Sequence, residues 1–530
     1  MPKVIGIGKQ RYDRIIENNL FYIDKTMFIK EWWENQDDVT LITRPRRFGK
    51  TLNMDMLKCF FSNEYKDRGD LFEGLDIWKE EKYREIQGTY PVIFLSFAKI
   101  KQNTYKDAIA GIKRIICDEI QKYIFLKDWD GLADAEKNNL KNITYGMDDV
   151  TAQEAIASLS NYLSRYYGKN VIILLDEYDT PMQEAYVNGY LEELVSFTRS
   201  FFNATFKSNL YLERAVITGI TRVSKESIFS DLNNLKVITV ESDEYSDTFG
   251  FSEEEVFLAL DDFNLSDKKQ IVKEWYDGFT FGSQRDIYNP WSIINFLENK
   301  KIDTYWADTS SNSLINHLIK KSVPEIKELM ELLLKRESIE VTFDDQIVFN
   351  QLDKSKNAIW SLLVASGYLK IDDIEYKGLL LKPWYHISIT NLETVSMFAN
   401  MFAGWFENPD ARYNDFIKSL LNNDLKGMNY YMNKVALATF SYFDTGKNPS
   451  ETLEPERFYH GFVLGLIVEL SDRYEVKSNR ESGFGRYDVM IIPLDKSEKA
   501  IVLEFKVHEN DEEKTLEETV SSALAQIEEK

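Results

Sequence analysis

A basic loop near the N-terminus carries the residue types that could hold a phosphate chain. The run RPRRFGKT (44–51) follows the apolar run VTLIT (39–43) and precedes the helical pattern LNMDMLKCFF (52–61). In such a strand–loop–helix setting, the Lys50 ammonium bridges the β- and γ-phosphates, and the Thr51 hydroxyl ligates Mg²⁺. Amides at the start of the following helix point at the β-phosphate, where the helix dipole adds positive potential. The predicted nucleotide-binding residues of the loop are Arg46, Arg47, Phe48, Gly49, Lys50 and Thr51.

One position of this loop departs from the plain pattern G-x-x-x-x-G-K-[ST]. Arg44 stands where the pattern has its first glycine, so the loop must turn there without the freedom in φ that glycine provides. The alternative interpretation is a basic turn between a strand and a helix, with no role in phosphate binding.

Two further apolar runs predict the rest of a nucleotide site. The run VIILLD (171–176) ends in Asp176 and is followed by Glu177. We expect this strand to lie beside the strand of the loop, with Asp176 orienting Mg²⁺ and Glu177 polarising the attacking water. At the end of the run starting at residue 215, Thr218 is a candidate γ-phosphate sensor and Arg222 a candidate charge-stabilising residue. A buried strand leading into a solvated loop, and an ordinary strand end, remain the alternatives.

A second group of candidate catalytic residues lies near the C-terminus. Asp488 falls in one predicted strand, and Glu504 and Lys506 fall in the next. Residues at i and i+2 of a strand share a face, so Glu504 and Lys506 point together. If Asp488 lies opposite them, two carboxylates can hold Mg²⁺ and the ammonium can steady the attacking water, an arrangement suited to phosphodiester hydrolysis. A merely solvated face of charged residues is the alternative.

The elements that must position these groups follow from the hydrophobic pattern. Residues 39–220 alternate short apolar runs with longer amphipathic stretches, which predicts a doubly wound α/β domain with a parallel sheet. The expected strands are 39–43, 91–97, 171–176 and 214–219, and the expected helices are 55–61 and the segments around 105–125 and 184–206.

Beyond the parallel sheet, the pattern changes twice. A mostly helical middle region is expected, with a few β segments near 340–390, followed by a small C-terminal α/β domain. In that last domain the expected order is a helix (458–472), strands at 474–479, 486–493 and 499–507, and an acidic helix to Lys530. The predicted domains are 1–250, 251–450 and 451–530.

Length and composition limit the class of protein. A chain of 530 residues is too long for one hydrophobic core. The net charge of −23 argues against a general polyanion-binding surface, so contact with DNA would be local. Two distant cysteines, Cys59 and Cys117, form no disulfide framework or metal-ligand spacing. Without a signal-like N-terminus or a membrane-length apolar run, we expect a soluble cytoplasmic protein.

Several motifs resemble one family of proteins. They are NLFYIDKT (19–26), LITRPRRFGKTLNMDML (41–57), ILLDEYDTP (173–181), TGITRVS (218–224), and WYDGFTFG (275–282) with IYNPWSI (287–293). Together they resemble the predicted AAA-ATPase-like family, which is common in bacteria and their mobile elements. SNRESGFGRYDVMIIP (478–493) and IVLEFKV (501–507) extend the resemblance to that family's C-terminal PD-(D/E)XK nuclease-superfamily domain.

The resemblance implies further features. The family itself carries arginine at the position of Arg44, and Tyr22, Asp24 and Lys25 match a family signature for which packing or capping is the expected role. The resemblance implies a restriction-endonuclease-like fold for the C-terminal α/β domain and predicts that Glu481 and Gln526 supplement the nuclease site. The superfamily core normally adds a strand after the last helix, so we expect a domain that is shortened relative to that core. His460 and His508 match no zinc spacing.

Two functional hypotheses follow from these motifs. The first is an ATPase that uses ATP and Mg²⁺ and is coupled to a Mg²⁺-dependent nuclease-like domain acting on DNA. The second is a nucleotide-switched interaction protein in which the nuclease fold is an inactive binding module. Residues 451–530 contain 10 Lys and Arg residues against 19 Asp and Glu residues, which disfavours DNA contact unless the basic residues cluster. A scaffold with two relic sites is also compatible with the sequence.

Overall fold

The computed structural model divides into two compact units. The first comprises Met1–Ile326 and Arg336–Val395, and the second comprises Lys327–Lys335 and Ser396–Lys530. The residues that the structure describes are 2–221, 228–229, 231–307, 315, 318–319, 324–334, 336–343, 357–405, 413–440, 463, 467, 470, 473–478, 481–482, 485–486, 488–496, 498–504 and 515–529. The predicted domain boundaries remain predictions.

A five-stranded parallel sheet forms the centre of the first unit. Its strands are β1 (Val39–Thr43), β2 (Val92–Ser96), β3 (Val171–Asp176), β4 (Leu212–Gly219) and β5 (Leu235–Ile238). The order in space is β2-β3-β4-β1-β5. The expectation that β3 lies beside β1 is therefore wrong, because β4 pairs with both strands and separates them. Apolar runs show that strands are buried, but they do not specify which strand is the neighbour.

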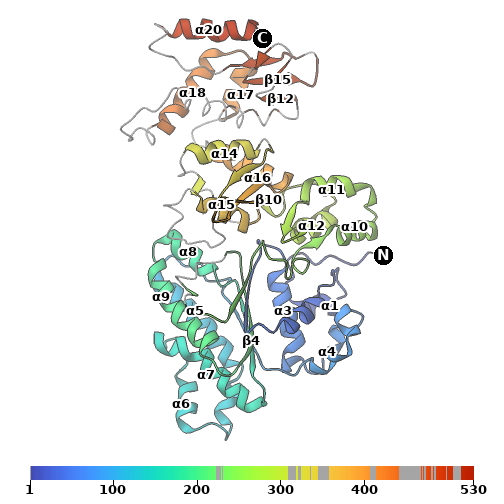
Figure 1. Ribbon diagram of the computed structural model, residues 1–530, viewed down its shortest axis with the longest axis vertical. Helices are drawn as coiled ribbons and strands as arrows, with labels where there is room; N and C mark the ends of the chain where they lie inside the picture. The colour runs from blue at the N-terminus through green and yellow to red at the C-terminus, as the bar shows by residue number, and fades with distance from the viewer. Residues whose placement is uncertain are drawn as a thin grey trace. The chain divides into compact units, whose positions relative to one another are not determined.

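Burial on both faces explains the apolar strand sequences. Every residue of β1 and of β3 is buried, as expected for parallel strands covered by helices on both sides. Helices α1, α3 and α4 cover one face of the sheet, and α5, α7 and α9 cover the other (Figure 1). The predicted doubly wound α/β fold is thus confirmed.

The helices of this layer begin and end at recognisable signals. Their bounds are α1 (Tyr12–Glu17), α2 (Met27–Asn35), α3 (Lys50–Phe61), α4 (Glu81–Ile86), α5 (Tyr105–Gln121), α6 (Asp134–Asn142), α7 (Asp149–Tyr167), α8 (Thr180–Asn188) and α9 (Leu191–Phe202). The Asp148 side chain caps α7 by accepting from the amide of Thr151, and α7 ends at Gly168 with φ of 69°. Helix α3 begins at Lys50, earlier than the expected residue 55, so Lys50 and Thr51 lie in its first turn.

Two small antiparallel sheets follow within the first unit. The sheet β6-β8-β7 consists of β6 (Phe251–Ser252), β7 (Phe279–Phe281) and β8 (Gln284–Tyr288), and it accompanies α10 (Glu253–Asp262), α11 (Lys269–Tyr276) and α12 (Pro290–Asn299). The sheet β10-β11-β9 consists of β9 (Ile339–Val341), β10 (Leu369–Lys377) and β11 (Lys382–Ile389), with α15 (Ala358–Ala365) nearby in the chain. These last strands lie in the region near 340–390 where β segments were expected.

The second unit contains its own sheet and core. Its strands β12 (Tyr474–Ser478), β15 (Val489–Pro493) and β16 (Ile501–Leu503) form an antiparallel sheet, and β13 (Glu481–Ser482) pairs with β14 (Gly485–Arg486). Its helices are α17 (Tyr413–Leu421), α18 (Leu425–Phe440) and α20 (Leu516–Glu529), while α14 (Pro324–Leu334) and α16 (Leu392–Trp405) each belong partly to both units. Phe416, Ile467 and Ile491 are among the residues of its hydrophobic core.

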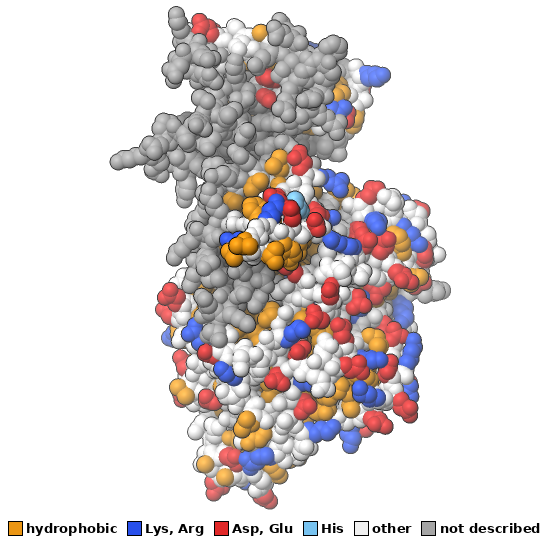
Figure 2. All heavy atoms as spheres, in the orientation of Figure 1, with side chains coloured by type: hydrophobic (Ala, Val, Ile, Leu, Met, Phe, Trp, Pro, Cys, Tyr) orange, Lys and Arg blue, Asp and Glu red, His pale blue; other side chains and the backbone are white. Residues whose placement is uncertain are grey.

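The surface charges, the two cysteines and the hydropathy of the helices can be compared with the expectations from the sequence. Acidic and basic side chains are interspersed on the face of the molecule shown in Figure 2, where the described residues are coloured. Cys59 and Cys117 are both free and buried. No helix in the described part of the chain is long and apolar enough to cross a membrane.

Candidate nucleotide and metal sites

The Lys50 side chain hydrogen-bonds to backbone carbonyls of the loop between β1 and α3. Gly49 has φ of 82° and precedes the helix, a conformation that a residue with a side chain adopts only at a cost. Lys50 Nζ donates to the carbonyl oxygens of Arg44 at 2.9 Å and Pro45 at 2.7 Å. Burial lowers the pKa of Lys50 to about 8. The ammonium thus lies within the loop, with main-chain oxygens as its acceptors.

Arg44 anchors the loop through contacts of its side chain with backbone carbonyls and an aromatic ring. Its side chain is fully buried, and Nη1 donates to the carbonyls of Thr43 at 2.9 Å and Thr239 at 2.7 Å. The guanidinium also lies 4.5 Å from the centre of the Phe281 ring. Burial lowers the pKa of Arg44, but carbonyl acceptors and the ring face stabilise its charged form. Arg44 is absent from the positive-φ positions, so no glycine is required there.

The other arginines of the loop connect it to neighbouring helices. Arg46 Nη2 donates to Gln183 Oε1 of α8 at 3.2 Å, and its carbonyl accepts from Trp306 Nε1 at 3.0 Å. Arg47 has φ of 67°, and its guanidinium lies 4.4 Å from the centre of the Trp291 ring on α12. The loop is therefore fixed by contacts from outside the parallel sheet.

Phe48 contributes to packing through its side chain. The ring is fully buried and makes edge contacts with Phe279 and Phe281, at centroid distances of 4.7 Å and 5.4 Å. A contribution of Phe48 to phosphate binding would come from its backbone.

The carboxylate at the end of β3 accepts hydrogen bonds from two of the other predicted site residues, Thr51 and Thr218. Asp176 Oδ2 accepts from Thr51 Oγ1 at 2.9 Å, and Oδ1 accepts from Thr218 Oγ1 at 2.7 Å. Asp176 is fully buried, and burial raises its pKa while the bond from Thr218 opposes this. Hydroxyl and carboxylate oxygens are the ligands that Mg²⁺ prefers, so the donor set fits that ion. The three side chains come from α3, β3 and β4, three elements far apart in the sequence.

Glu177 occupies a strained position beside this carboxylate. Its φ is 52°, which is uncommon for a residue other than glycine and typical of functional sites. Its amide donates to Thr218 Oγ1 at 3.4 Å, and its Oε2 accepts from Thr180 Oγ1 at 3.1 Å. Arg222, the candidate charge-stabilising residue, lies outside the described residues.

A cavity of about 400 Å³ opens in front of the loop. This volume lies within the range of about 300–1,000 Å³ that is common for small-molecule sites. Its polar lining includes Lys50, Thr51 and Glu177, and its apolar lining includes Ile5, Phe21, Phe251, Trp291 and Ile294. Apolar and aromatic side chains can cover a nucleoside while the loop holds charged groups.

Two residues near this cavity were not predicted from the sequence. Asp179 is fully buried and accepts from the backbone amides of Ile220 and Thr221. Gln183 lines the cavity. Asp179 is the third acid of the DEYD pattern (176–179), a signal that could have drawn attention to it, whereas nothing in the sequence marks Gln183.

The family-signature residues near the N-terminus have structural contacts. Lys25 Nζ forms an ion pair with Glu255 at 2.7 Å, and Asp24 accepts from the amides of Thr26 and Asp76 at 2.8 Å each. Tyr22 Oη lies 3.5 Å from the Met56 sulfur. These contacts agree with the packing and capping roles expected for them.

In the second unit, the strand register places two predicted carboxylates opposite each other. Asp488 immediately precedes β15, and Glu504 immediately follows β16. The strands pair antiparallel, with Val489 opposite Leu503, so the next pair outward is Asp488 and Glu504. Directly opposite residues have Cβ atoms about 5 Å apart, a separation that lets two carboxylates share a divalent ion. Both residues are half-buried.

The remaining candidates of this domain cannot be placed in the site. Lys506, His460 and His508 lie outside the described residues. Glu481 belongs to β13 and Gln526 to α20, but their side chains are likewise outside the described part of the structure.

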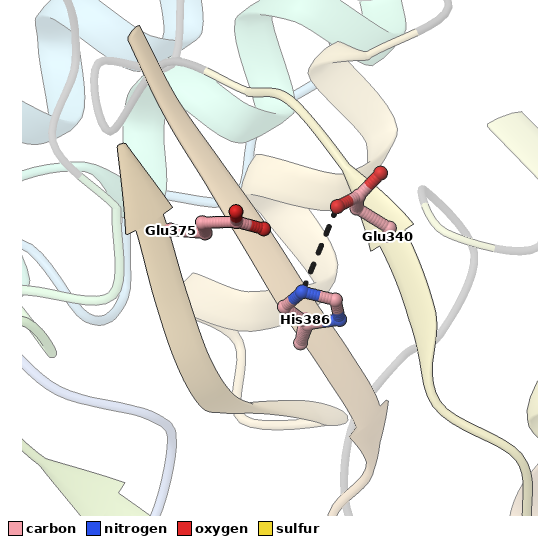
Figure 3. A group of neighbouring side chains, drawn as sticks. All are labelled: Glu340, Glu375 and His386. Atoms are coloured by element: carbon pink, nitrogen blue, oxygen red, sulfur yellow. Dashed lines mark ion pairs between the residues drawn. The ribbon is translucent and has the colours of Figure 1, made fainter. Parts of the chain in front are cut away.

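A separate group of side chains on the sheet β10-β11-β9 brings three possible metal ligands within 4.8 Å of one another. Glu340, Glu375 and His386 come together on this sheet (Figure 3), and an ion pair of 3.6 Å joins His386 Nε2 to Glu340 Oε1. Lys377 forms ion pairs with both glutamates. The group is a cross-strand arrangement of opposite charges at the surface.

Comparisons with known proteins agree with the two regions just described. Residues 6–229, which contain the loop, Asp176 and Thr218, match the family described as Predicted AAA-ATPase. Residues 454–530, which contain Asp488 and Glu504, match the PD-(D/E)XK nuclease superfamily. The chain combines these two domains. The predicted architecture is thus confirmed.

The sequence of one curated relative aligns with most of the chain. The chain is 24% identical over 504 residues to the "Uncharacterized protein in vnfD 5'region" of Azotobacter chroococcum mcd 1. The alignment covers 92% of this chain and 87% of the relative. The similarity therefore includes both domains and the region that connects them.

Proposed function

We propose that the AAA-ATPase-like domain binds ATP with Mg²⁺ and hydrolyses it. The observation that carries this proposal is the contact between Thr51 Oγ1 and Asp176 Oδ2 at 2.9 Å, beside Lys50 and at the start of α3. A hydroxyl, a carboxylate and an ammonium are thereby gathered where helix amides favour an anion. An isolated basic turn would not require these three groups to meet.

Each side chain has a role that follows from its position. Lys50 would exchange its carbonyl acceptors for β- and γ-phosphate oxygens, which are stronger, charged acceptors. Thr51 and Asp176 would hold Mg²⁺, which when bound neutralises charge on the phosphates. Glu177 would accept a hydrogen bond from the attacking water and orient it towards phosphorus. Thr218, bonded to Asp176, would contact the γ-phosphate, and Arg222 remains a predicted charge-stabilising residue.

The test is ATP binding and turnover by the full-length protein. Lys50→Ala should weaken ATP binding, and Asp176→Ala should remove most Mg²⁺-dependent turnover, with losses of at least about 100-fold for groups of this kind. Lys58→Ala, on the same helix but outside the cavity lining, is the matched control and should retain wild-type turnover. Equal turnover by the wild type and both site variants, or no binding at millimolar ATP, would remove the proposal.

We also propose that the C-terminal domain hydrolyses phosphodiester bonds in DNA. The register of β15 and β16, which brings Asp488 opposite Glu504, supports a site for one divalent ion. Plasmid nicking with Mg²⁺ or Mn²⁺ should be lost in Asp488→Ala and in Glu504→Ala. Asp495→Ala, at an exposed position after β15, is the control and should still nick.

The second candidate function is a nucleotide-switched interaction protein with an inactive nuclease fold. The excess of 19 acidic over 10 basic residues in 451–530 favours it, because a negative domain repels a phosphate backbone. Absence of nicking by the wild type under all divalent ions, together with ATP binding, would support this alternative.

A further inference from the structure

We infer that Asp179 and Gln183 are positioning residues for ATP hydrolysis, which link the phosphate-binding loop to the segment that follows β4. The inference rests on the proposed ATPase function and adds two residues to it. It depends on a continuous series of hydrogen bonds from Arg46 to Thr221.

The centre of this series is the carboxylate of Asp179. Its side chain is fully buried, and one oxygen, Oδ2, accepts three bonds from the segment after β4. The donors are the amide of Ile220 at 3.0 Å, the amide of Thr221 at 2.9 Å and Thr221 Oγ1 at 2.8 Å. Burying a carboxylate is costly unless it is bonded in this way, so the three bonds fix the segment strongly.

Tyr178 reinforces the same connection. Its amide donates to the carbonyl of Thr218 at 3.0 Å, and its hydroxyl donates to the carbonyl of Thr221 at 2.8 Å. Between these residues, a Cβ added to Gly219 would lie 2.6 Å from the Tyr178 ring and 2.9 Å from Asp179 Oδ1. The turns after β3 and β4 are therefore packed without space between them.

Gln183 extends the series to the phosphate-binding loop. Its Nε2 donates to Asp179 Oδ2 at 3.1 Å, and its Oε1 accepts from Arg46 Nη2 at 3.2 Å. One amide group thus connects a loop arginine with the buried carboxylate. Since Arg46 and Gln183 both line the cavity, a phosphate bound there would compete for the Arg46 guanidinium.

The segment that Asp179 holds, which consists of Ile220 and Thr221, directly follows β4, the strand that contains Thr218. Thr218 contacts Asp176 and Glu177, and Thr221 immediately precedes Arg222. A displacement of about 1 Å at a reacting centre can reduce a rate by about 100-fold. Loss of the Asp179 bonds should therefore slow hydrolysis more than it weakens ATP binding.

The experiment compares ATP affinity and turnover in matched variants of the full-length protein. Asp179→Ala removes every hydrogen bond that the Asp179 carboxylate accepts. Gln183→Met removes the hydrogen bonds of Gln183 to Arg46 and to Asp179 while keeping similar volume, and it leaves the bonds between Asp179 and the segment after β4 in place. For both, we expect kcat to fall by at least about 10-fold while Kd for ATP stays within about threefold of wild type. Gln183→Glu keeps the acceptor for Arg46 but places a second carboxylate beside Asp179, so it should be no better than Gln183→Met.

Bound-nucleotide stoichiometry and thermal melting separate this role from a purely structural one. A fall in kcat with full ATP stoichiometry supports the inference, and Asp179→Asn, which retains an acceptor oxygen, should recover part of kcat. Two results for Gln183→Met would overturn the inference: a kcat equal to that of the wild type, or equal losses of kcat and of bound-ATP stoichiometry. Because Gln183 is only half-buried, this variant provides the test even if Asp179→Ala fails to fold. If the wild type itself has no turnover, the ATPase proposal fails and the inference fails with it. If the wild type is active and the variants have the same kcat, only the inference is refuted.

Discussion

Replacement of Arg44 by glycine tests whether the unusual first position of the loop is a structural device. The substitution Arg44→Gly would restore the plain pattern G-x-x-x-x-G-K-[ST], so the plain pattern taken alone predicts no loss of stability or binding. The structure predicts the opposite. Arg44 is fully buried, and its guanidinium holds the carbonyls of Thr43 and Thr239.

The magnitude follows from the contacts that would be lost. Two carbonyls within 2.9 Å of Nη1 would lose a charged donor, at about 1–3 kcal/mol each. The contact with Phe281 adds about 1–2 kcal/mol, and the added chain entropy of glycine costs about 0.5–1 kcal/mol more. Removal of the buried guanidinium also removes its desolvation penalty, because Arg44 Nε is buried without a hydrogen-bond partner. This gain offsets part of the loss in stability. We expect a net loss of about 3–5 kcal/mol in unfolding free energy.

Urea unfolding followed by tryptophan fluorescence, together with ATP affinity, measures this effect. Arg47→Gly is the matched control in the same loop, because Arg47 has φ of 67° and glycine adopts that conformation without strain. This control should change stability by less than about 1 kcal/mol, from the lost stacking on Trp291 balanced by relief of strain. Equal unfolding midpoints for Arg44→Gly and wild type would refute the assigned role.

Three other changes have defined outcomes. Desolvation, with Asp286 nearby, raises the pKa of Asp277 to about 7, whereas the same carboxyl group titrates near pH 4 in the unfolded chain. The folded state therefore keeps its proton to higher pH than the unfolded chain does, and the free energy of unfolding falls as pH rises from about 4 to about 7. Asp277→Asn should therefore stabilise the protein by about 1–3 kcal/mol at pH 8, after discounting for solvent screening, and the gain should vanish towards pH 4 in denaturation curves; an equal gain at both pH values would contradict this. Thr218→Val should lower ATP turnover by about 10-fold through loss of its bond to Asp176, and Thr218→Ser should restore it, in a steady-state phosphate-release assay. Glu393 is buried, and it accepts from Ser292 Oγ and from the amides of Tyr305 and Trp306. Glu393→Ala leaves these amides without an acceptor and should cost about 2–4 kcal/mol in urea unfolding, whereas Glu393→Gln can keep one oxygen on the amides and donate to Ser292 Oγ, so it should cost less; an unchanged midpoint for Glu393→Ala would contradict that role.

The local features of this protein could be predicted from its sequence. The runs at 39–43 and 171–176 are apolar throughout because both faces of those strands are buried, and the structure has β1 and β3 at these positions. The pattern of Gly49, Lys50 and Thr51 also predicted the start of a helix, although α3 begins earlier than its apolar periodicity suggested.

Neighbour relations in space could not be predicted in the same way. The sequence suggested that β3 lies beside β1, but β4 separates them. Strand pairing in a parallel sheet depends on how crossover helices pack, and apolar residues in every strand satisfy that packing equally well. Helix α7 (149–167) was also absent from the prediction, although it packs on the sheet face that carries α5.

The sequence by itself therefore determined the chemistry available to this chain: a loop that can bind phosphate, an acid at the end of the run 171–176, two acids in the predicted C-terminal strands, and the division into a P-loop part and a nuclease-like part. Only the tertiary structure decided that Arg44 is a buried anchor and that Asp179 and Gln183 join the loop to the turn after β4. The reason is physical: residue types and short-range spacing set hydrogen-bonding capacity and burial tendency, whereas partners hundreds of residues apart, such as Arg44 with Thr239, meet only when the whole core packs.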